Sequence, residues 1–388
     1  MNRDFDYIVI GLGGIGSAAA YWLSRSAGAK VLGLEQFELG HVRGESQDHS
    51  RIIRLSYHKP ECVEFAKQAY SAWKILESES KDEVVIRTGG LDLWPPNAFI
   101  PMSDYTESLD ACHVPYEVWN AEEIRKWYPQ FLIDDGTVGM YQSDAGIAAA
   151  ARANFAHQKM ARENGAVLKE HAKVMSIFER EGEYEVNLQD GFYRGRKLIL
   201  TAGPWSNDLL SKFEIQLPLT VTQEQVAYFV PNNLHDFAPD RFPIWIWMDE
   251  PSFYGFPVFG EAAVKAGQDV GGKEVTADTR TFDLDLDAFE RLQKFMKKVL
   301  PSAMNRLLYT KSCLYTLTPD RDFVIDALPQ NPNCFVAIGA GHAFKFASII
   351  GKVLSELAMQ GTTESNIDLF RLDRPILKEK NPAKSFLV

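Results

Sequence analysis

A glycine-rich turn between a short apolar strand and a helix constrains the fold of this chain more than any other feature. Residues 6–10 are an apolar run rich in β-branched side chains, typical of a buried parallel strand, and Gly-Leu-Gly-Gly-Ile-Gly follows at residues 11–16. Apolar residues then recur at helical spacing as far as Gly28, and residues 30–35 predict a second strand. This order predicts a βαβ unit that binds a dinucleotide.

The residues of this unit have separate predicted tasks. Gly11 permits the tight turn, Gly13 lets the backbone approach a pyrophosphate, and Gly16 lets the helix pack on the strand. The helix N-terminus offers N–H groups and a positive dipole end to the phosphates. Glu35 ends the second strand, where its carboxylate would accept hydrogen bonds from ribose hydroxyls. The pattern does not separate FAD from NAD, and a purely structural turn is the alternative.

Two later segments repeat the order of strand followed by helix. Residues 197–203 and 334–341 are apolar runs that end in glycine, and residues 342–359 follow the second run as a long amphipathic helix. We expect both strands to join the N-terminal unit in one parallel sheet, although the three pieces lie far apart in the sequence.

The material between these pieces has a different character. Residues 242–248 and 252–259 are aromatic, alternating runs that predict antiparallel strands, and residues 287–300 predict a helix. We therefore predict an α/β fold, α+β overall, in which a Rossmann-type domain is interleaved with an antiparallel-sheet domain that covers the substrate. The predicted Rossmann-type domain is discontinuous and takes residues 1–85, 146–215 and 313–388, and the substrate domain takes residues 86–145 and 216–312.

Charge and cysteine content narrow the classes of partner. The formal net charge of −11 argues against a nucleic-acid or anionic-membrane partner, because phosphates would be repelled. The four cysteines are too few and too scattered for a disulfide framework or a metal site. The apolar run at residues 7–23 is broken by glycines and follows an acidic lead, so it predicts neither a signal peptide nor a membrane span. We expect a cytoplasmic protein without a metal.

Three further segments give the chain a family resemblance: residues 41–54, which contain Arg-Ile-Ile-Arg, residues 311–326, which contain Cys-Leu-Tyr-Thr, and residues 339–346, which contain His-Ala-Phe-Lys-Phe. With the N-terminal turn, they make the chain resemble the monomeric sarcosine oxidase family, which includes N-methyltryptophan oxidase and pipecolate oxidase. The resemblance spans essentially the whole chain. It implies FAD, a fold like that of glutathione reductase and D-amino-acid oxidase, and a monomer. It also implies hydride transfer from the carbon beside the nitrogen of a small secondary amino acid, reduction of O2 to H2O2, and hydrolysis of the imine.

The resemblance also implies residues that hold the cofactor. Cys313 matches the cysteine that the family joins to the 8α position of the flavin through a thioether; the alternative is a buried, small apolar cysteine. Further implied contacts to FAD come from Gly14, Ile15, Ser46, Arg51, Val174, Gly203, Gly341 and Lys345. The helix predicted from His342, with Lys345 in its first turn, would stabilise negative charge on the pyrimidine end of the ring.

The implied catalytic residues form a second group. Arg54 and Lys345 would bind the substrate carboxylate, which an acidic protein can do only in a locally basic pocket. In a helix, Arg51 and Arg54 would share a face. Lys265 matches the family lysine that activates oxygen. The alternatives are structural ion pairs for the arginines, a solvated Lys345, and an edge-strand role for Lys265. Tyr254, Tyr315 and His342 are predicted to belong to the same cavity, although either tyrosine could equally be plain core.

The chain departs from the family beside the expected cavity. Gln268-Asp269 stands where monomeric sarcosine oxidase has a histidine, and Ser-Gln-Asp-His-Ser precedes Arg51 where the family has adjacent histidines. The aromatic residues Trp245, Trp247 and Phe253 hint at a cavity larger than sarcosine needs. Four alternatives stay open: a D-amino-acid or glycine oxidase, a flavin dehydrogenase that avoids oxygen, an NAD-dependent dehydrogenase, and a non-catalytic flavoprotein subunit.

Overall fold

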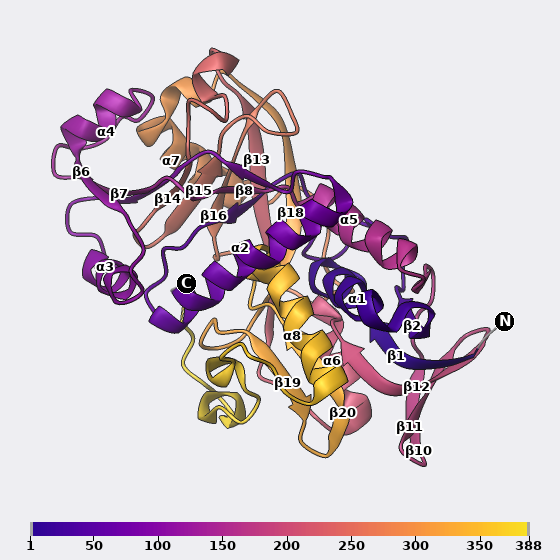
Figure 1. Cartoon of the computed structure of the whole chain (residues 1–388). Helices are drawn as coiled ribbons and strands as arrows, with labels where there is room; N and C mark the ends of the chain where they lie inside the picture. Colours follow the sequence, from indigo (N-terminus) through magenta and orange to yellow (C-terminus); the bar gives the residue numbers. More distant parts are fainter. Residues whose placement is uncertain (1–2, 386–388) are drawn as a thin grey trace.

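The computed structural model describes residues 3–385 of the 388-residue chain, and these residues form two large sheets and one small sheet (Figure 1). The first sheet consists of β1 (Asp4–Ile10), β2 (Val31–Leu34), β9 (Val167–Lys169), β10 (Ser176–Arg180), β11 (Glu183–Leu188), β12 (Gly191–Leu200), β19 (Val324–Leu328) and β20 (Asn331–Ile338). Their order is β10-β11-β12-β1-β2-β9, and β20 pairs with both β12 and β19. Strands β20, β12, β1, β2 and β9 run parallel to their neighbours in this series. The predicted union of three distant segments in one parallel sheet is confirmed.

The second sheet is antiparallel except at one pair of strands. It consists of β5 (Gly90–Trp94), β6 (Glu117–Asn120), β7 (Val138–Gln142), β13 (Thr220–Val230), β14 (Ile244–Trp247), β15 (Ser252–Phe256), β16 (Val264–Asp269), β17 (Lys273–Glu274) and β18 (Arg306–Leu317). The exception is β5, which runs parallel to β14. The predicted antiparallel pairing of the two aromatic runs is confirmed in β14 and β15.

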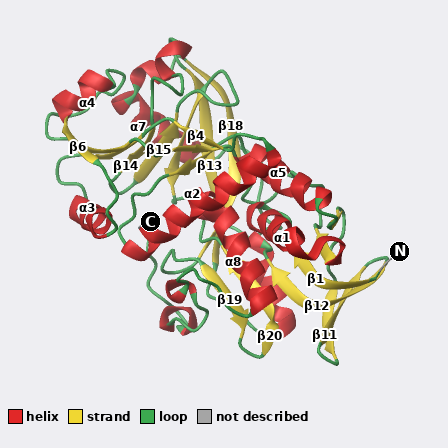
Figure 2. Ribbon diagram, in the orientation of Figure 1, coloured by secondary structure: helices red, strands yellow, loops and turns green. Residues whose placement is uncertain are grey.

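The third sheet is small. In the sequence, its strands come where the chain passes from one large sheet to the other. It consists of β3 (Arg51–Ile53), β4 (Val85–Arg87) and β8 (Gly146–Ala148). The helices are α1 (Gly14–Ala27), α2 (Pro60–Ser80), α3 (Met102–Ala111), α4 (Ala121–Trp127), α5 (Ala150–Glu163), α6 (Ser206–Leu210), α7 (Leu286–Val299) and α8 (Ala347–Gln360). Figure 2 shows α1, α2, α5 and α8 grouped beside the first sheet, whereas α4 and α7 lie beside the second.

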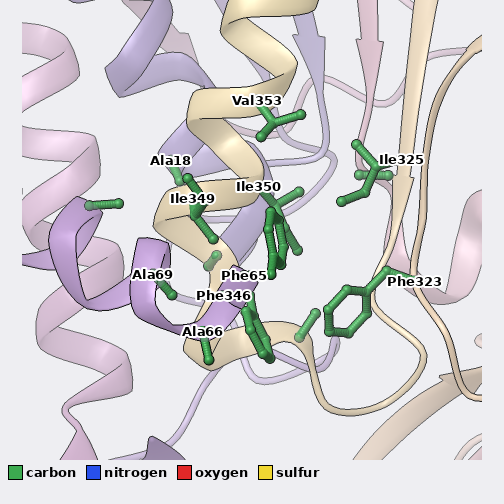
Figure 3. Close-up of a cluster of buried hydrophobic side chains, with 14 of the residues drawn as sticks. Ala18, Phe65, Ala66, Ala69, Phe323, Ile325, Phe346, Ile349, Ile350 and Val353 are labelled. Carbon is green, nitrogen blue, oxygen red and sulfur yellow. The ribbon is translucent and has the colours of Figure 1, made fainter. Parts of the chain in front are cut away.

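The largest core cluster joins these helices to the first sheet. Apolar side chains of α1, α2 and α8 meet those of β19 in this cluster, and Phe346 stacks on Phe65 of α2 with ring centroids 5.6 Å apart (Figure 3). Helix α1 crosses α8 closely because Gly351 has no side chain: a Cβ there would lie 2.6 Å from the Ala18 backbone. This packing fixes the N-terminus of α1 against the end of the first sheet.

One local condition is not met, and one local expectation was wrong. Arg51 and Arg54 do not share a helical face, because the segment that begins at Arg51 forms β3, whose Ile-Ile pair favours a strand and pairs with β8. The helix predicted from His342 begins later, at Ala347, after a 3-10 turn at Ala343–Phe346. Trp73 Nε1 donates to the Lys345 carbonyl oxygen at 2.7 Å, so a tertiary contact shapes this turn.

The predicted domain boundary at residue 313 falls inside β18. Residues of this strand on both sides of Cys313 pair with β13 in the second sheet, and the first sheet resumes only at β19. The boundary after residue 85 likewise falls inside β4, the one at residue 146 coincides with the start of β8, and the one after residue 215 falls between β12 and β13. The division into two domains stays a prediction.

Candidate active site

A cavity of about 310 Å³ lies where β1 and β2 end. Most residues predicted to bind the cofactor line it, namely Gly11, Gly13, Gly14, Ile15, Glu35, Ser46, Val174 and Gly203. Gly16 does not line it but packs α1 on the turn, since a Cβ there would lie 1.8 Å from the Gly11 carbonyl oxygen. Gly13 is also restricted, because its Cβ would lie 3.0 Å from Ser46 Oγ. The glycines of this turn therefore present their backbone to the cavity with no side chain in the way.

Glu35 is held as a carboxylate at the far side of the turn. Its oxygens accept hydrogen bonds from Leu12 N at 2.9 Å and Phe37 N at 3.1 Å, and His41 Nε2 lies 3.4 Å away. Burial favours the neutral acid, but the hydrogen bonds from His41 and Leu12 outweigh burial, so the pKa of Glu35 is lowered. An ionised carboxylate with lone pairs to spare can accept hydroxyl donors.

A second cavity, of about 150 Å³, adjoins the first. The two share Gly14, Ile15, Glu45, Ser46 and Gly339 in their linings. Besides the shared Gly14, Ile15 and Ser46, the second cavity is lined by most of the predicted catalytic residues and by three further predicted cofactor residues: Arg51, Arg54, Tyr254, Tyr315, Gly341, His342 and Lys345. The fold therefore brings these side chains from β3, β15, β18 and the 3-10 turn into one space.

Arg54 is fixed by a carboxylate outside the cavity. Its Nη1 donates to Asp92 Oδ2 at 3.0 Å, and Ser56 Oγ donates to the same oxygen at 2.6 Å. Arg54 and Asp92 are 4% and 3% exposed, so the pair is desolvated. Burial opposes the charge on Arg54, but Asp92 outweighs burial and raises the pKa of the guanidinium. Arg54 Nε is buried without a hydrogen-bond partner among the described residues.

Lys345 is half-buried, and its amine has no carboxylate of its own in the described part of the chain. Its Nζ lies 5.7 Å from the ring centroid of Tyr57, and no ion pair of Lys345 is present among residues 3–385. Burial, and then the like charge of Arg54, lower the pKa of Lys345 to about 7, although Asp269 opposes them. An anion bound between Lys345 and Arg54 would offset the repulsion between these two positive charges.

His342 is a neutral imidazole with one unused nitrogen. Its Nε2 lies 2.8 Å from the Arg321 carbonyl oxygen, which makes Nε2 the protonated nitrogen. Nδ1 is buried and accepts from no partner among the described residues. Burial, followed by the charges of Lys345 and Arg321, holds the pKa of His342 well below its usual value.

The aromatic groups divide between cavity and core. Tyr254 and Tyr315 line the second cavity, and burial raises the pKa of each, so both stay phenols. Trp245, Trp247 and Phe253, which were expected to enlarge the cavity, do not line it, because all three belong to the core of the second sheet. They pack against Phe295 of α7.

Besides Gly16, two predicted residues, Lys265 and Cys313, line neither cavity. Lys265 is 3% exposed, and its Nζ lies 2.6 Å from Asp48 Oδ2 and 2.9 Å from the Ser50 carbonyl oxygen. Cys313 lies in β18, where burial raises its pKa to about 11 although the positive charge of Arg51 opposes that rise. Lys265 sits close behind the cavity wall, since its Nζ lies 4.7 Å from the ring centroid of the lining residue Phe256.

Several charged groups of the site were missed from the sequence: Glu45, Asp48, Asp92 and Arg321. Asp92 carried a usable signal, because an acid inside the apolar strand Gly-Leu-Asp-Leu-Trp is costly to bury unless it is paired. Asp48 lies in the segment that departs from the family pattern, which was the available signal there.

The described residues, 3–385, contain no cluster of three metal-ligating side chains. In the same part of the chain, every helix is too short or too polar to cross a bilayer.

The chain belongs to the family of FAD dependent oxidoreductases (DAO), whose sequence profile matches residues 6–357. Within that family it is 31% identical over 386 residues to monomeric sarcosine oxidase from Arthrobacter sp. (strain TE1826), which covers 98% of this chain and 99% of the relative. It is also 28% identical over 378 residues to N-methyl-L-tryptophan oxidase from Escherichia coli O139:H28, covering 95% and 99% of the two chains.

Solved structures show the same fold. NikD, described as an unusual amino acid oxidase essential for nikkomycin biosynthesis, superposes with a TM-score of 0.84 at 24% identity, covering 95% of this chain and 98% of NikD. L-proline dehydrogenase from P. horikoshii superposes with a TM-score of 0.84 at 20% identity, covering 96% and 97%. The α/β fold with an FAD-binding sheet is thereby confirmed, and an NAD-dependent dehydrogenase is set aside.

The residues of the first cavity fit FAD. Its glycine turn is bare where a Cβ would meet Ser46, and the N-terminus of α1 faces it with a positive dipole end. Glu45 lines both cavities, and its Oε1 is buried without a hydrogen-bond partner among the described residues. A flavin dinucleotide extending from the first cavity into the second would run past this orphaned oxygen.

The Arg54–Asp92 pair gives a test of the charge balance in the site. Asp92→Asn leaves a buried guanidinium without its counter-charge, so we expect the free energy of unfolding to fall by about 3 kcal/mol. Urea unfolding of the FAD-loaded protein measures this loss. Asp144→Asn is the matched control, because its pair with Arg87 is half-exposed, and we expect a change below about 1 kcal/mol. Equal effects of the two substitutions would contradict the account.

Proposed function

We propose that the protein is an FAD-dependent oxidase of a small secondary amino acid, N-methylated or cyclic. The observation that carries the proposal is the unpaired Lys345 beside Arg54 in the second cavity. These two cations would bind a carboxylate. The small volume of the cavity favours a small amino acid, and the names of the relatives support a secondary amine.

Bound FAD would supply the hydride acceptor, and its reoxidation by O2 would give H2O2. Arg54 and Lys345 hold the carboxylate and so orient the carbon beside the nitrogen. The amine must be neutral to lose a hydride, and desolvation on entering the cavity would lower its pKa. His342 Nδ1 is a free acceptor for the amine N–H, while Tyr254 and Tyr315 offer hydroxyl donors. The oxidised product is an imine, which water hydrolyses to an amine and a carbonyl compound.

Four finer features belong to the same proposal. The flavin is attached through a thioether at Cys313: burial raises the pKa of this thiol to about 11, and the positive charges of Arg51 and Lys265 act in the opposite direction and favour the thiolate that attachment needs. The oxidant is O2, as the names of the oxidase relatives suggest. The protein is a monomer, which the name of the relative monomeric sarcosine oxidase supports. A cytoplasmic location is supported by its four free thiols.

A flavin dehydrogenase acting on the same substrates is the second candidate. One observation favours it: Lys265, which is proposed to assist the reaction with O2, is engaged by Asp48 and lines neither cavity. Comparing the reoxidation of reduced enzyme by O2 and by a quinone separates the two candidates. The oxidase reacts rapidly with O2, whereas the dehydrogenase reacts only with the quinone.

Anaerobic reduction tests the substrate class directly. We expect sarcosine, proline or pipecolate to bleach the oxidised-flavin absorbance, and the corresponding amides, which lack the carboxylate, to fail. Arg54→Met should weaken substrate binding by about 100-fold or more, because it removes one side of a desolvated charge contact. Arg54→Lys is the control that keeps the charge. Reduction by glycine or a D-amino acid alone would transfer the assignment to the D-amino-acid or glycine oxidase type.

The Lys345 ammonium gives carboxylate binding a pH dependence. Its pKa of about 7 lies below that of an unfolded lysine, so it is charged below pH 7 and loses its charge as the pH rises. A simple carboxylate without an amine, such as propionate, should therefore bind more weakly above pH 7, as measured by perturbation of the flavin spectrum. Lys345→Met should bind weakly at every pH, and Lys352→Met on the surface of α8 should behave as wild type. A Lys345→Met profile that keeps the wild-type pH dependence would refute the assignment.

The covalent flavin is tested by acid denaturation followed by filtration. We expect the yellow colour to stay with the wild-type polypeptide and to pass the filter in Cys313→Ala, because only a thioether survives denaturation. Cys62→Ala is the control, since its thiol is also half-buried but lies in α2. Release of FAD from the wild-type protein would refute the thioether at Cys313, but it would leave the assignment as a flavoenzyme unchanged.

A further inference from the structure

Three positively charged side chains surround the buried carboxylate of Asp48. Its Oδ2 lies 2.6 Å from Lys265 Nζ and 3.7 Å from Arg51 Nη1, and its Oδ1 lies 3.3 Å from Lys311 Nζ. The Tyr228 hydroxyl donates to Oδ1 at 2.7 Å. Both oxygens are thus fully engaged, and the carboxylate is only 5% exposed.

The backbone that carries Asp48 is fixed by the start of α5. The N-cap residue of this helix, Ala149, offers no side-chain oxygen to the first N–H groups. Instead the carbonyl oxygens of Asp48 and His49 accept from Ala151 N at 3.0 Å and Ala150 N at 3.1 Å. The loop therefore caps the helix, and the helix in turn holds the Asp48 carboxylate in place.

Lys265 lies directly behind the wall of the second cavity. In β16 it is paired with Tyr228 of β13 on one side and with Phe256 of β15 on the other. Its Nζ lies over the Phe256 ring, and Phe256 lines the cavity. The charge on this amine therefore acts on the cavity across a single aromatic ring.

Asp48 is the main group that keeps this amine charged. Burial and the neighbouring Arg51 both favour a neutral Lys265, and together they lower its pKa to about 8 against the opposing effect of Asp48. The pKa of Asp48 itself is lowered: burial would raise it, but Lys265 and Arg51 outweigh burial. Without the carboxylate, three cations would face one another in a desolvated space.

The remaining titratable groups come from every element packed around the pair. They are His49 from the loop, Arg51 from β3, Tyr228 from β13, Tyr254 from β15, Glu261 before β16, and Tyr309, Lys311, Cys313 and Tyr315 from β18. Glu261 accepts from the Tyr309 hydroxyl at 3.1 Å and lies 3.3 Å from His49 Nε2, so its charge is directed away from Lys265.

We propose that Asp48 is a positioning residue that keeps the Lys265 side chain charged and fixed behind the cavity wall, and that it thereby sets the pH range in which O2 reoxidises the enzyme. This inference rests on the proposed function, in which Lys265 assists the reaction with O2. Asp48 itself contacts neither cavity and acts through Lys265.

Separate measurement of the two half-reactions tests the proposal. For the wild type, we expect reoxidation of the substrate-reduced enzyme by O2 to slow as the pH rises through about 8. In Asp48→Asn this transition should move down by at least about one pH unit, since a nearby opposite charge shifts a pKa by that amount or more. Reoxidation of the variant should then be about tenfold slower at slightly alkaline pH and recover in acid, while anaerobic reduction by substrate keeps its rate.

The matched control is Glu261→Gln, which removes a neighbouring carboxylate that does not touch Lys265. Its reoxidation profile should match that of the wild type. An Asp48→Asn profile with the wild-type transition would overturn the proposal. Failure of substrate reduction in the wild type would instead defeat the proposed function, so the two failures are distinguishable.

Stability gives a readout that does not depend on turnover. Lys265 has a folded pKa below its unfolded value, so its contribution makes stability rise with pH above the folded pKa. In the wild type this rise in stability begins at about pH 8. In Asp48→Asn the pKa of Lys265 is lower, so the rise should begin at a lower pH. The difference in free energy of unfolding between the wild type and Asp48→Asn should therefore narrow as the pH approaches 8. Asp48, whose pKa is lowered, stays ionised in this range and adds no slope. A gap that is constant with pH would contradict the pairing.

A second variant covers the case in which Asp48→Asn does not fold. Asp48→Asn combined with Lys265→Met removes the carboxylate together with the amine that it charges, so we expect the double variant to fold and to lose the pH transition in reoxidation. Failure of the double variant as well would show that Asp48 serves the fold independently of Lys265, which would overturn the proposal.

Discussion

Buried positive charge at the meeting of the two large sheets is the constraint around which the active site is built. A desolvated cation is stable only when a carboxylate or several hydrogen-bond acceptors compensate its charge. Arg54 has Asp92, Lys265 has Asp48, and Arg321 Nη2 lies 3.4 Å from Asp269 Oδ2. Lys345 is the exception, since no carboxylate pairs with it in residues 3–385. The site therefore has room for one more negative charge, and that charge is the substrate carboxylate in our proposal.

The fold provides this arrangement by bringing short segments from distant parts of the chain to one edge. The turn after β1 forms the first cavity, and β3 runs from the loop at Asp48 to Arg54 beside the second. The 3-10 turn before α8 delivers Lys345, and Trp73 of α2 fixes that turn by a hydrogen bond to its backbone. The linings of the two cavities overlap at Gly14, Ile15, Glu45, Ser46 and Gly339, where cofactor and substrate meet in our proposal.

The sequence predicted the parts of the structure that depend on local pattern. The glycine turn, its strand and its helix are set by spacing and by the absence of side chains, and their predicted positions match β1, α1 and β2 closely. The resemblance supplied Arg54, Lys345, Tyr254 and Tyr315, and the structure brings all four together in one cavity.

The counter-charges were beyond the reach of the sequence because they depend on tertiary contacts. Asp92 is separated from Arg54 by 38 residues, and Asp48 from Lys265 by a far longer stretch, so no periodicity connects them. The strand at Arg51 and the 3-10 turn at Lys345 were missed for a similar reason, since pairing with β8 and a hydrogen bond from Trp73 determine them. The aromatic side chains of β14 were assigned to the cavity because sequence alternation does not say which face of a sheet is covered by a helix such as α7.

A crystal structure of the FAD-loaded protein with a non-reactive carboxylate, such as propionate, tests the central claim most directly. The account predicts that the carboxylate lies between Arg54 and Lys345, within hydrogen-bonding distance of both, in the cavity that Tyr254 and Tyr315 also line. A carboxylate bound elsewhere, or a Lys345 that turns away to pair with a protein carboxylate, would contradict it.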